Sequence, residues 1–243
     1  MLIVNADDWG RSPAETNAAL QCHQRGRITS VSAMVFMSDS ERAAELAKEN
    51  QIDVGLHLNF AEKFSGDSVP ATLEAYQDRI TGFLMQNRYS QLLYNPFLRR
   101  QFAYSYRVQA EEFQRLFGKS PSRIDGHHHM HLCANVLFSR LIPAGMLVRR
   151  NFSFWPGEKS LLNRTYRKAV DYWLSRRYQL ADYFFDLTQA IRELKFERVA
   201  MLAKTSNVEL MTHPVVSLES ELLMSDQFEA AFQHLQVGHY DAV

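Results

Sequence analysis

The stretch LIVNADDWG, residues 2–10, places two adjacent carboxylates, Asp7 and Asp8, directly after a short apolar run. Successive side chains of a strand point to opposite faces, so both carboxylates can reach one site only where the strand passes into a turn. The pair Trp9 and Gly10 favours such a turn. The stretch therefore predicts a buried first strand that ends at a polar site.

Similar short runs of β-branched and apolar residues recur along the chain and alternate with longer amphipathic segments. The expected strands cover residues 2–6, 29–36, 52–58, 122–126, 146–149, 180–185 and 207–212, and the expected helices cover 13–25, 39–49, 91–117, 158–177 and 219–236. This alternation is typical of α/β proteins with a parallel sheet, either open or closed into a barrel. Residues 60–90 fit neither pattern, so we expect a long irregular insertion there.

The composition favours one domain and a small substrate. With 243 residues, 46% of them hydrophobic, the chain can form one large core, and we expect a single domain over residues 1–243. The 27 basic and 27 acidic residues cancel, so no net charge draws the protein to nucleic acid or to an anionic membrane.

The cysteines and the apolar runs bear on the compartment. The two cysteines, Cys22 and Cys133, are too few for a disulfide framework, and the first residues are too acidic for a signal peptide. No apolar run approaches the roughly 20 residues that cross a bilayer. We expect a cytoplasmic protein without a membrane span.

Metal-ligating residue types follow several of the expected strands. The strand ends read NADDWG, VGLHLNF, IDGHHHMH, LVRRNF and ELMTHP. In a parallel α/β sheet these carboxyl ends meet at one edge. One carboxylate with two imidazoles is a common ligand set for a divalent metal, zinc above all, that keeps a position open for water. The sequence therefore predicts one divalent metal site.

The histidine cluster after the fourth strand leaves the ligands open. His127 and His131 would share one face of a helix, whereas His127, His129 and His131 would share one face of an extended segment. One or two of them are expected to bind the metal and the others to line the pocket. Asp125 could orient a ligand imidazole.

Two roles are open for the paired carboxylates. One could bind the metal and stay ionised, while its neighbour accepts a proton from the attacking water as a general base. A turn that caps the first helix explains the same residues, because Ser12 before Pro13 is a good N-cap.

Taken together, these motifs resemble the YdjC-like carbohydrate deacetylases, which include the chitooligosaccharide deacetylases. NADDWG is similar to the family's opening motif, VGLHLN to its Gly-(Leu/Met)-His motif and DGHHHMH to its Asp-(Ser/Gly)-His-x-His-x-His motif, while LVRR and ELMTHP match its later motifs. The chain departs from the family at Trp9, where phenylalanine is usual, and at Val215, where glycine is frequent. The resemblance implies a distorted (β/α) barrel that removes acetyl groups from N-acetylated sugars with one divalent metal ion, Mg²⁺ or Zn²⁺, and possible homodimers.

The resemblance also implies a role for each matching residue. It makes Asp8, His57 and His127 the metal ligands, Asp7 the general base and His213 the general acid. By similarity to related deacetylases, Arg149 or its neighbour Arg150 would hold Asp7, and we favour Arg149. No acyl-enzyme is needed, and no Gly-x-Ser-x-Gly elbow is present.

Aromatic residues near strand ends are candidates for sugar stacking. Trp9, Phe60 and Trp155 lie there, and we expect Trp9 and Trp155, with His129 and His131, to contact the substrate. The stretch of residues 161–180 mixes five basic residues with aromatics. It could touch a membrane surface or a phosphorylated sugar, but we interpret it as the solvated face of an amphipathic helix.

Other function classes remain as alternatives. A receiver domain also opens with an acidic pair, but it would need an aspartate after its third strand, where this chain has His57. A barrel-type metal-dependent phosphoesterase could use Asp and His ligands, although two-metal sites of that kind need more of them. A non-catalytic sugar-binding protein with the same fold is the last alternative.

Overall fold

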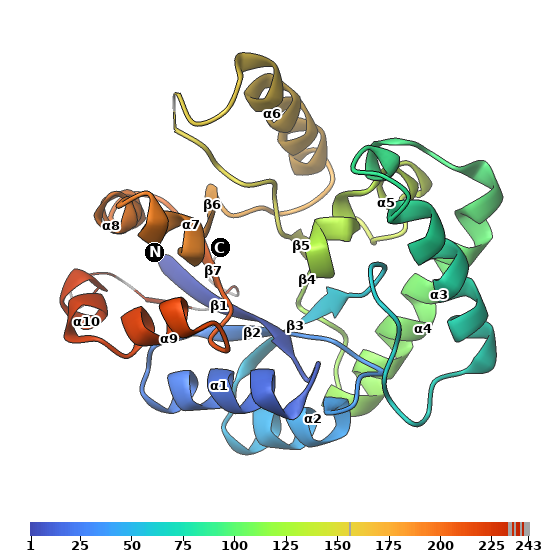
Figure 1. Ribbon diagram of the computed structural model, residues 1–243, viewed down its shortest axis with the longest axis horizontal. Coiled ribbons are helices and arrows are strands. Elements are labelled where there is room, and N and C mark those ends of the chain that lie inside the picture. The colour runs from blue at the N-terminus through green and yellow to red at the C-terminus, as the bar shows by residue number, and fades with distance from the viewer. Residues whose placement is uncertain (156, 233–234, 236, 239, 241–243) are drawn as a thin grey trace. The chain divides into compact units, whose positions relative to one another are not determined.

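The computed structural model describes residues 1–155, 157–232, 235, 237–238 and 240 (Figure 1). Seven parallel strands form one sheet with the order β5-β4-β3-β2-β1-β7-β6. The strands are β1 (Leu2–Trp9), β2 (Ser30–Ala33), β3 (Asp53–Leu58), β4 (Arg123–Gly126), β5 (Leu147–Val148), β6 (Tyr183–Asp186) and β7 (Val208–Thr212). Each overlaps a strand expected from the sequence, so the predicted β/α alternation is confirmed.

Helices separate most of the strands, as the sequence predicts. The α-helices are α1 (Pro13–Gln24), α2 (Ser40–Glu49), α3 (Ala71–Leu84), α4 (Arg99–Phe117), α5 (Ala134–Ser139), α6 (Leu161–Ser175), α7 (Leu187–Arg192), α8 (Phe196–Ala203), α9 (Ser217–Leu223) and α10 (Asp226–Phe232). The 3₁₀ segments are η1 (Ser90–Leu92), η2 (Pro96–Leu98) and η3 (His127–Leu132).

The irregular insertion expected over residues 60–90 is wrong over residues 71–84, because α3 lies there. The buried positions of α3 are Leu73, Gln77, Ile80 and Leu84, which recur every three or four residues. Gln77 is the one polar residue among these buried positions. It interrupts the apolar periodicity from which a helix would be predicted.

The chain divides into two compact units, each built from separate segments. One unit comprises Met1–Ala6, Asn17–Val31 and Ala144–Val243, and the other comprises Asp7–Thr16 and Ser32–Pro143. We call them unit 1 and unit 2. The single domain expected over residues 1–243 stays a prediction.

Buried parallel strands form the core of unit 1. Residues 2–6 of β1 pair with Val208–Thr212 of β7, and β7 pairs in turn with β6. Every residue of β1 and β7 is buried. A strand covered on both faces reads as a near-continuous apolar run, which is why the sequence marks β1 so clearly.

In unit 2, β3 pairs with β4 and α3 packs beside α4 (Figure 1). Gly55 of β3 lets the side chain of Arg123 cross the strand, because a Cβ atom at Gly55 would lie 2.4 Å from Arg123 Cγ. Arg123 is buried and donates to Asp53 over 2.7 Å. The missing side chain of Gly55 therefore makes room for a buried ion pair.

Gly55→Ala is expected to lower the free energy of unfolding by about 1–3 kcal/mol, because the added methyl must displace Arg123. Denaturant unfolding measures the change. Gly82→Ala is the matched control, since nothing lies within 4 Å of a Cβ at Gly82 in α3, and it is expected to be neutral or slightly stabilising. Equal effects of the two substitutions would contradict the packing argument.

No helix in the described part of the chain is both long and apolar enough to cross a membrane. Cys22 and Cys133 are both buried free thiols, and burial raises the pKa of Cys22 to about 11 and that of Cys133 to about 12. Both thiols therefore stay protonated at neutral pH, which suits structural rather than nucleophilic cysteines.

Candidate metal centre and active site

The end of β1 resolves how two neighbouring carboxylates face one point. Asp8 adopts a left-handed backbone conformation, with φ of 65°. This region is costly for most residues, and aspartate is among the few that tolerate it. As a result Asp8 Oδ1 lies 3.4 Å and Asp7 Oδ2 3.9 Å from Nε2 of His57. The turn expected after the first strand thus begins at Asp8.

His57 is held by a carboxylate on the other side of its ring. Nδ1 of His57, at the end of β3, lies 2.7 Å from Oδ1 of Asp125 in β4. Ser32 Oγ donates to the second oxygen of Asp125 over 2.5 Å. Because Nδ1–H of His57 donates a hydrogen bond to Asp125, Nε2 of His57 is directed toward Asp7 and Asp8, the arrangement typical of metal-ligating histidines.

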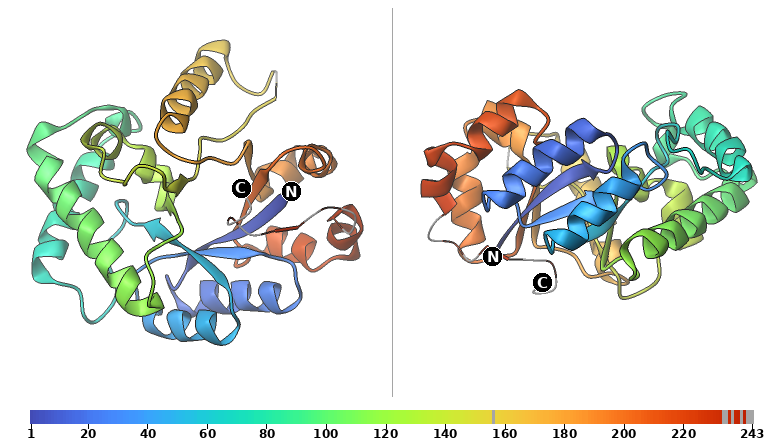
Figure 2. Two further views of the ribbon diagram at one scale, coloured as in Figure 1. Left: turned by 180° about the vertical axis from the view of Figure 1, so that it is seen from behind. Right: turned by 90° about the horizontal axis from the view of Figure 1, so that it is seen from below.

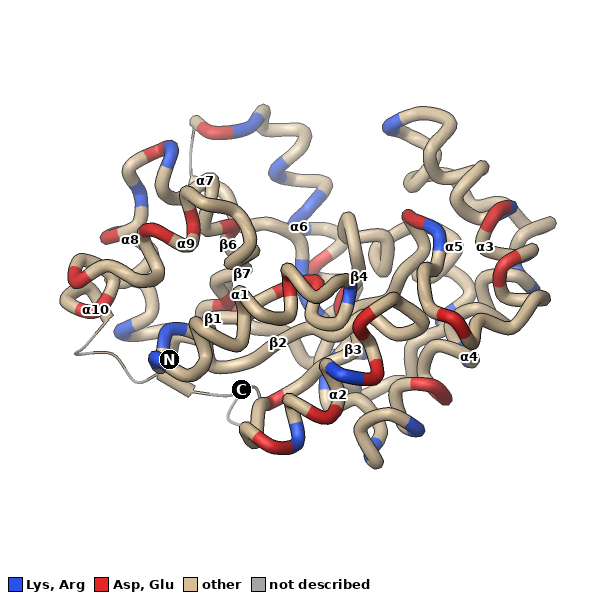
Figure 3. Tube along the Cα trace, turned by 60° about the horizontal axis from the view of Figure 1, so that its bottom comes forward, with Lys and Arg blue, Asp and Glu red and all other residues tan. Residues whose placement is uncertain are grey.

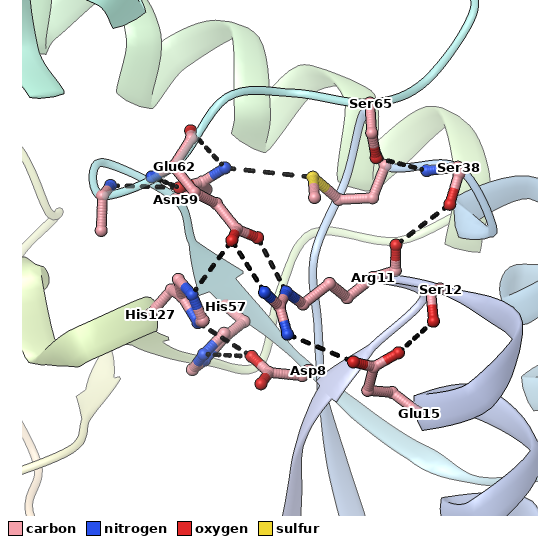
Figure 4. Close-up of polar contacts among 12 residues, drawn as sticks. Asp8, Arg11, Ser12, Glu15, Ser38, His57, Asn59, Glu62, Ser65 and His127 are labelled. Atoms are coloured by element: carbon pink, nitrogen blue, oxygen red, sulfur yellow. Dashed lines mark hydrogen bonds and ion pairs between the residues drawn. The ribbon is translucent and has the colours of Figure 1, made fainter. Parts of the chain in front are cut away.

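His127 completes the group from the start of η3. Its Nδ1 lies 2.9 Å from Oδ1 of Asp8. His128 and His129 have left-handed φ angles of 50° and 58°, which break the regular spacing. Neither a helical nor an extended face therefore describes the cluster, in which His127 forms a group with Asp8 and His57. Figure 4 shows these three side chains converging.

The protonation of the cluster follows from charge and burial. Burial by itself lowers the pKa of His57, but the negative charges of Asp7 and Asp125 outweigh it and raise this pKa to about 10. Burial likewise opposes ionisation of Asp8, yet its bonds with His127 and His57 hold its pKa well below the usual range. Without another cation, a proton on His57 balances the carboxylates.

The residues present fit a divalent metal ion. Asp8, His57 and His127 each offer one ligand atom, all lie within 4.8 Å of one another, and all three residues are buried. Asp7, His57 and Asp125 form an overlapping group of the same kind. Nitrogen donors suit zinc, and the carboxylates also accept magnesium. The second ring nitrogen of His57, Nδ1, already bonds the carboxylate of Asp125, as is usual for histidines that bind metals.

Metal affinity is expected to rise by roughly tenfold per pH unit until the pH reaches the His57 pKa of about 10. The pKa of His57 is raised, so its proton is bound throughout the neutral range and must leave before the imidazole can coordinate. Titration calorimetry in buffers of different ionisation enthalpy measures the released proton directly. A pH-independent affinity with no proton release would contradict the protonated state of the metal-free site.

Glu62 and Arg11 lie at the same site and were not expected from the sequence. Oε2 of Glu62 is 3.6 Å from Nε2 of His127, a buried atom that makes no hydrogen bond to any described residue. Arg11 donates to both carboxylate oxygens of Glu62 over 2.9 and 3.0 Å (Figure 4). Burial opposes ionisation of Glu62, but His127 and Arg11 lower its pKa to about 2.

A buried amide network positions Glu62. Oδ1 of Asn59 accepts from the backbone N–H of Glu62 over 3.0 Å, and Nε2 of Gln77 donates to the Glu62 carbonyl over 2.7 Å. Oε1 of Gln109 accepts from the Asn59 N–H over 2.8 Å. Thus α3 and α4 support the segment that follows β3. The polar residues inside these apolar stripes, Gln77 and Gln109, were the available signal in the sequence.

Asp125→Asn is expected to weaken metal binding by about 10–100-fold, because the imidazole of His57 loses its charged acceptor. Competition with a chromogenic chelator gives the dissociation constant. Ser32→Ala serves as the control, since it removes one bond to Asp125 and leaves the carboxylate on His57. An unchanged constant for Asp125→Asn would contradict the orienting contact.

Two aromatic side chains expected to contact substrate lie in the interior. Trp9 is fully buried, and its Nε1 donates to the carbonyl of Ala43 in α2 over 3.0 Å. His131 is also fully buried, and it packs against Gly126, where a Cβ would lie 2.9 Å from the His131 backbone N. Neither ring exposes surface to a ligand in this structure, which corrects that expectation. His129 is half-buried.

The arginine pair separates into a buried and a partly exposed residue, both in unit 1. Arg149 is buried, and its Nε donates to Glu209 over 2.6 Å. Its guanidinium also lies over the ring of Phe184, 4.9 Å from the centroid. Arg150 instead pairs with Asp171 over 2.8 Å. The role expected for Arg149 toward Asp7 stays a prediction.

His213 follows β7 in unit 1 and has a carboxylate beside it. The backbone N–H of His213 donates to Glu219, which is fully buried, and Nδ1 of His213 lies 3.8 Å from Oε1 of Glu219. Thr188 also donates to Glu219. The half-buried His213 side chain is therefore held near a fixed negative charge.

Trp155 is partly exposed in unit 1. Its ring stacks on Phe185 with a centroid distance of 4.6 Å, and Arg198 lies over its ring, 4.9 Å from the centroid. Trp155 and Phe185 line a small cavity together with Lys195. This is the aromatic surface that the sequence analysis expected to meet a sugar, and the assignment stays a prediction.

Several curated proteins are similar to this chain. The chain is 33% identical over 134 residues, 54% of its length and 50% of the relative, to a chitooligosaccharide deacetylase of Proteus mirabilis (strain HI4320). It is 26% identical over 230 residues, covering 93% of the chain and 86% of the relative, to a carbohydrate deacetylase of Clostridium beijerinckii. The chain spans about half the length of the first curated relatives it matches.

A solved structure shows the same fold. A protein of Enterococcus faecalis V583 assigned to cellobiose-phosphate cleavage superposes with a TM-score of 0.71 at 17% identity, over 99% of this chain and 97% of that one. The expected α/β fold of the distorted (β/α) barrel type is therefore confirmed. The family model described as YdjC-like protein matches residues 1–239, so the chain belongs to the YdjC-like family.

Proposed function

We propose that this chain is a metal-dependent carbohydrate deacetylase, which hydrolyses the acetamide of an N-acetylated sugar such as a chitooligosaccharide or a related glycan. One observation carries the proposal: Asp8, His57 and His127 form a buried group of potential metal ligands, and the neighbouring carboxylate of Asp7 lies 3.9 Å from Nε2 of His57. The names of the relatives, chitooligosaccharide deacetylase and carbohydrate deacetylase, support the reaction class.

The proposed metal ligands and the proposed general base have different roles in the reaction. A divalent ion held by Asp8, His57 and His127 would polarise the acetamide carbonyl and lower the pKa of water. Asp7 would accept the proton of the attacking water, a role for which its position beside the ligand set suits it. Asp125 and Glu62 would hold the two imidazoles in orientation.

His213 would protonate the departing sugar nitrogen as the general acid. The carboxylate of its buried neighbour Glu219 lies 3.8 Å from Nδ1 of His213 and would orient the imidazole for this step. Arg149 would orient Asp7, and Trp155 and His129 would contact the sugar. The whole chain would act as one domain, and association as a homodimer is part of the proposal.

Acetate release from N,N'-diacetylchitobiose and other N-acetylated sugars tests the proposal. The protein is assayed as purified, after chelation and after restoring Mg²⁺ or Zn²⁺. Acetate that disappears with chelator and returns with metal is expected. Phosphate release from phosphate esters without acetate release would favour the phosphoesterase alternative. Sugar binding without any product would favour a non-catalytic binding protein.

A further inference from the structure

Helix α6 turns its apolar side outward. Its large exposed side chains are Leu161, Leu162, Tyr166, Tyr172 and Trp173. At about 100° per residue these five positions fall within roughly 140° of the helix circumference, so they share one face. Leu161 and Leu162 expose 78% and 82% of their surface. We call these five residues the outer face of α6.

The opposite side of α6 is mostly polar, and part of it packs against the rest of unit 1, to which the helix belongs. Asp171 is buried, where it accepts from Arg150 and from both the backbone and side-chain amides of Asn151. Leu174 is the other buried residue of the helix. The expected solvated face is found at Lys168 and Arg176, which are exposed, but the apolar side of the helix is exposed as well. In Figure 1 and from behind in Figure 2, α6 stands apart from α7 to α10.

Positive charge surrounds this helix. Residues 159–177 carry six basic side chains and one acidic one, a net charge of +5 in a chain whose total is zero (Figure 3). A cavity of about 130 Å³ beside α6 is lined by Arg150, Arg164, Arg167 and Lys168, with Asp171 as its one acidic group. The side chains of Arg164 and Lys168 form no hydrogen bond or ion pair with any residue that the structure describes.

We infer that the outer face of α6, with the basic cluster around it, docks on an anionic lipid surface. Exposed Leu, Tyr and Trp side chains bordered by Lys and Arg are the pattern of helices that lie in a membrane interface. The basic residues supply the charge complementarity to phosphate headgroups, and the side chains of Arg164 and Lys168 have no ion-pair partner among the described residues. This inference goes beyond the proposed deacetylase activity and does not depend on it.

A second copy of the chain is the weaker occupant of the same face. Two copies joined through α6 would bring together two segments that each carry a net charge of +5. Like charges placed across an interface oppose association, whereas an anionic bilayer neutralises them. The absence of a spanning helix among the described residues agrees with surface docking rather than insertion.

Flotation of the full chain with vesicles tests this inference. Vesicles of phosphatidylcholine mixed with phosphatidylglycerol are expected to bind at least about tenfold more protein than vesicles of phosphatidylcholine alone, and added salt should reduce the difference. Leu162→Asp is expected to lower binding by about tenfold or more. The matched control is Leu194→Asp, since Leu194 is 92% exposed in unit 1 outside α6 and is expected to leave binding unchanged.

Trp173 gives an independent readout if Leu162→Asp disturbs folding. Its indole fluorescence should shift to the blue with anionic vesicles, and Trp173→Phe should remove that shift, because Trp9 is buried and Trp155 stacks on Phe185 outside α6. Replacing Arg164 and Lys168 with glutamine should weaken binding to anionic vesicles selectively. Failure to float with anionic vesicles, or equal binding by Leu162→Asp and Leu194→Asp, would overturn the inference. A dimer that Leu162→Asp dissociates, without vesicle binding, would assign the face to a second copy.

Discussion

Asp7→Asn protein should bind its metal with near-normal affinity and release acetate about 10²–10⁴-fold more slowly than the parent chain. The amide keeps the size and position of Asp7, but it cannot accept a proton. Asp7 is buried beside His57 at 3.9 Å, a longer separation than that of Asp8, so its loss should disturb the ligand set less.

Paired measurements separate this loss from a folding or metal defect. Metal content is determined on the same sample as the rate of acetate release, and thermal unfolding is compared with and without metal. A loss of turnover with full metal occupancy supports the base assignment. A near-normal rate would show that Asp7 is not the base, and loss of metal would show that it is a ligand instead.

Asp8→Ala should abolish stoichiometric metal binding and, with it, the metal-dependent activity. The expected loss of affinity exceeds the roughly 10–100-fold that removal of an outer carboxylate causes, because Asp8 is the one carboxylate of the proposed triad. Asp8 Oδ1 also lies 2.9 Å from Nδ1 of His127 and 3.4 Å from Nε2 of His57. Its removal therefore takes away a negative charge that contacts both imidazoles.

The neighbouring substitution is the natural control for this result. Asp7→Asn and Asp8→Ala change adjacent residues of one strand end, and only the second should empty the site. Calorimetric titration with Zn²⁺ and with Mg²⁺ distinguishes them. Full metal occupancy in Asp8→Ala protein would contradict the ligand set and would favour the overlapping group of Asp7, His57 and Asp125.

The sequence by itself determined the order of the strands along the chain and placed metal-ligating residue types at several of their carboxyl ends. Fully buried strands need continuous apolar runs, and those runs are local, so β1 to β7 could be located from composition and periodicity. Each proposed ligand directly follows or ends such a run, as Asp8, His57 and His127 do. The carboxyl ends of parallel strands share one sheet edge, which is why a metal site could be expected there, whereas the choice of Asp8, His57 and His127 followed from the resemblance to the YdjC-like deacetylases.

Only the tertiary structure decided what depends on contacts distant in sequence. The left-handed Asp8 aims two successive carboxylates at one imidazole, and the segment after β3 brings Glu62 to His127, 65 residues further along the chain. Trp9 was expected at a pocket wall but packs under α2, because burial depends on what covers a strand end. The same holds for α6, whose periodicity predicts a helix with one apolar face, whereas only packing determines that this face points outward.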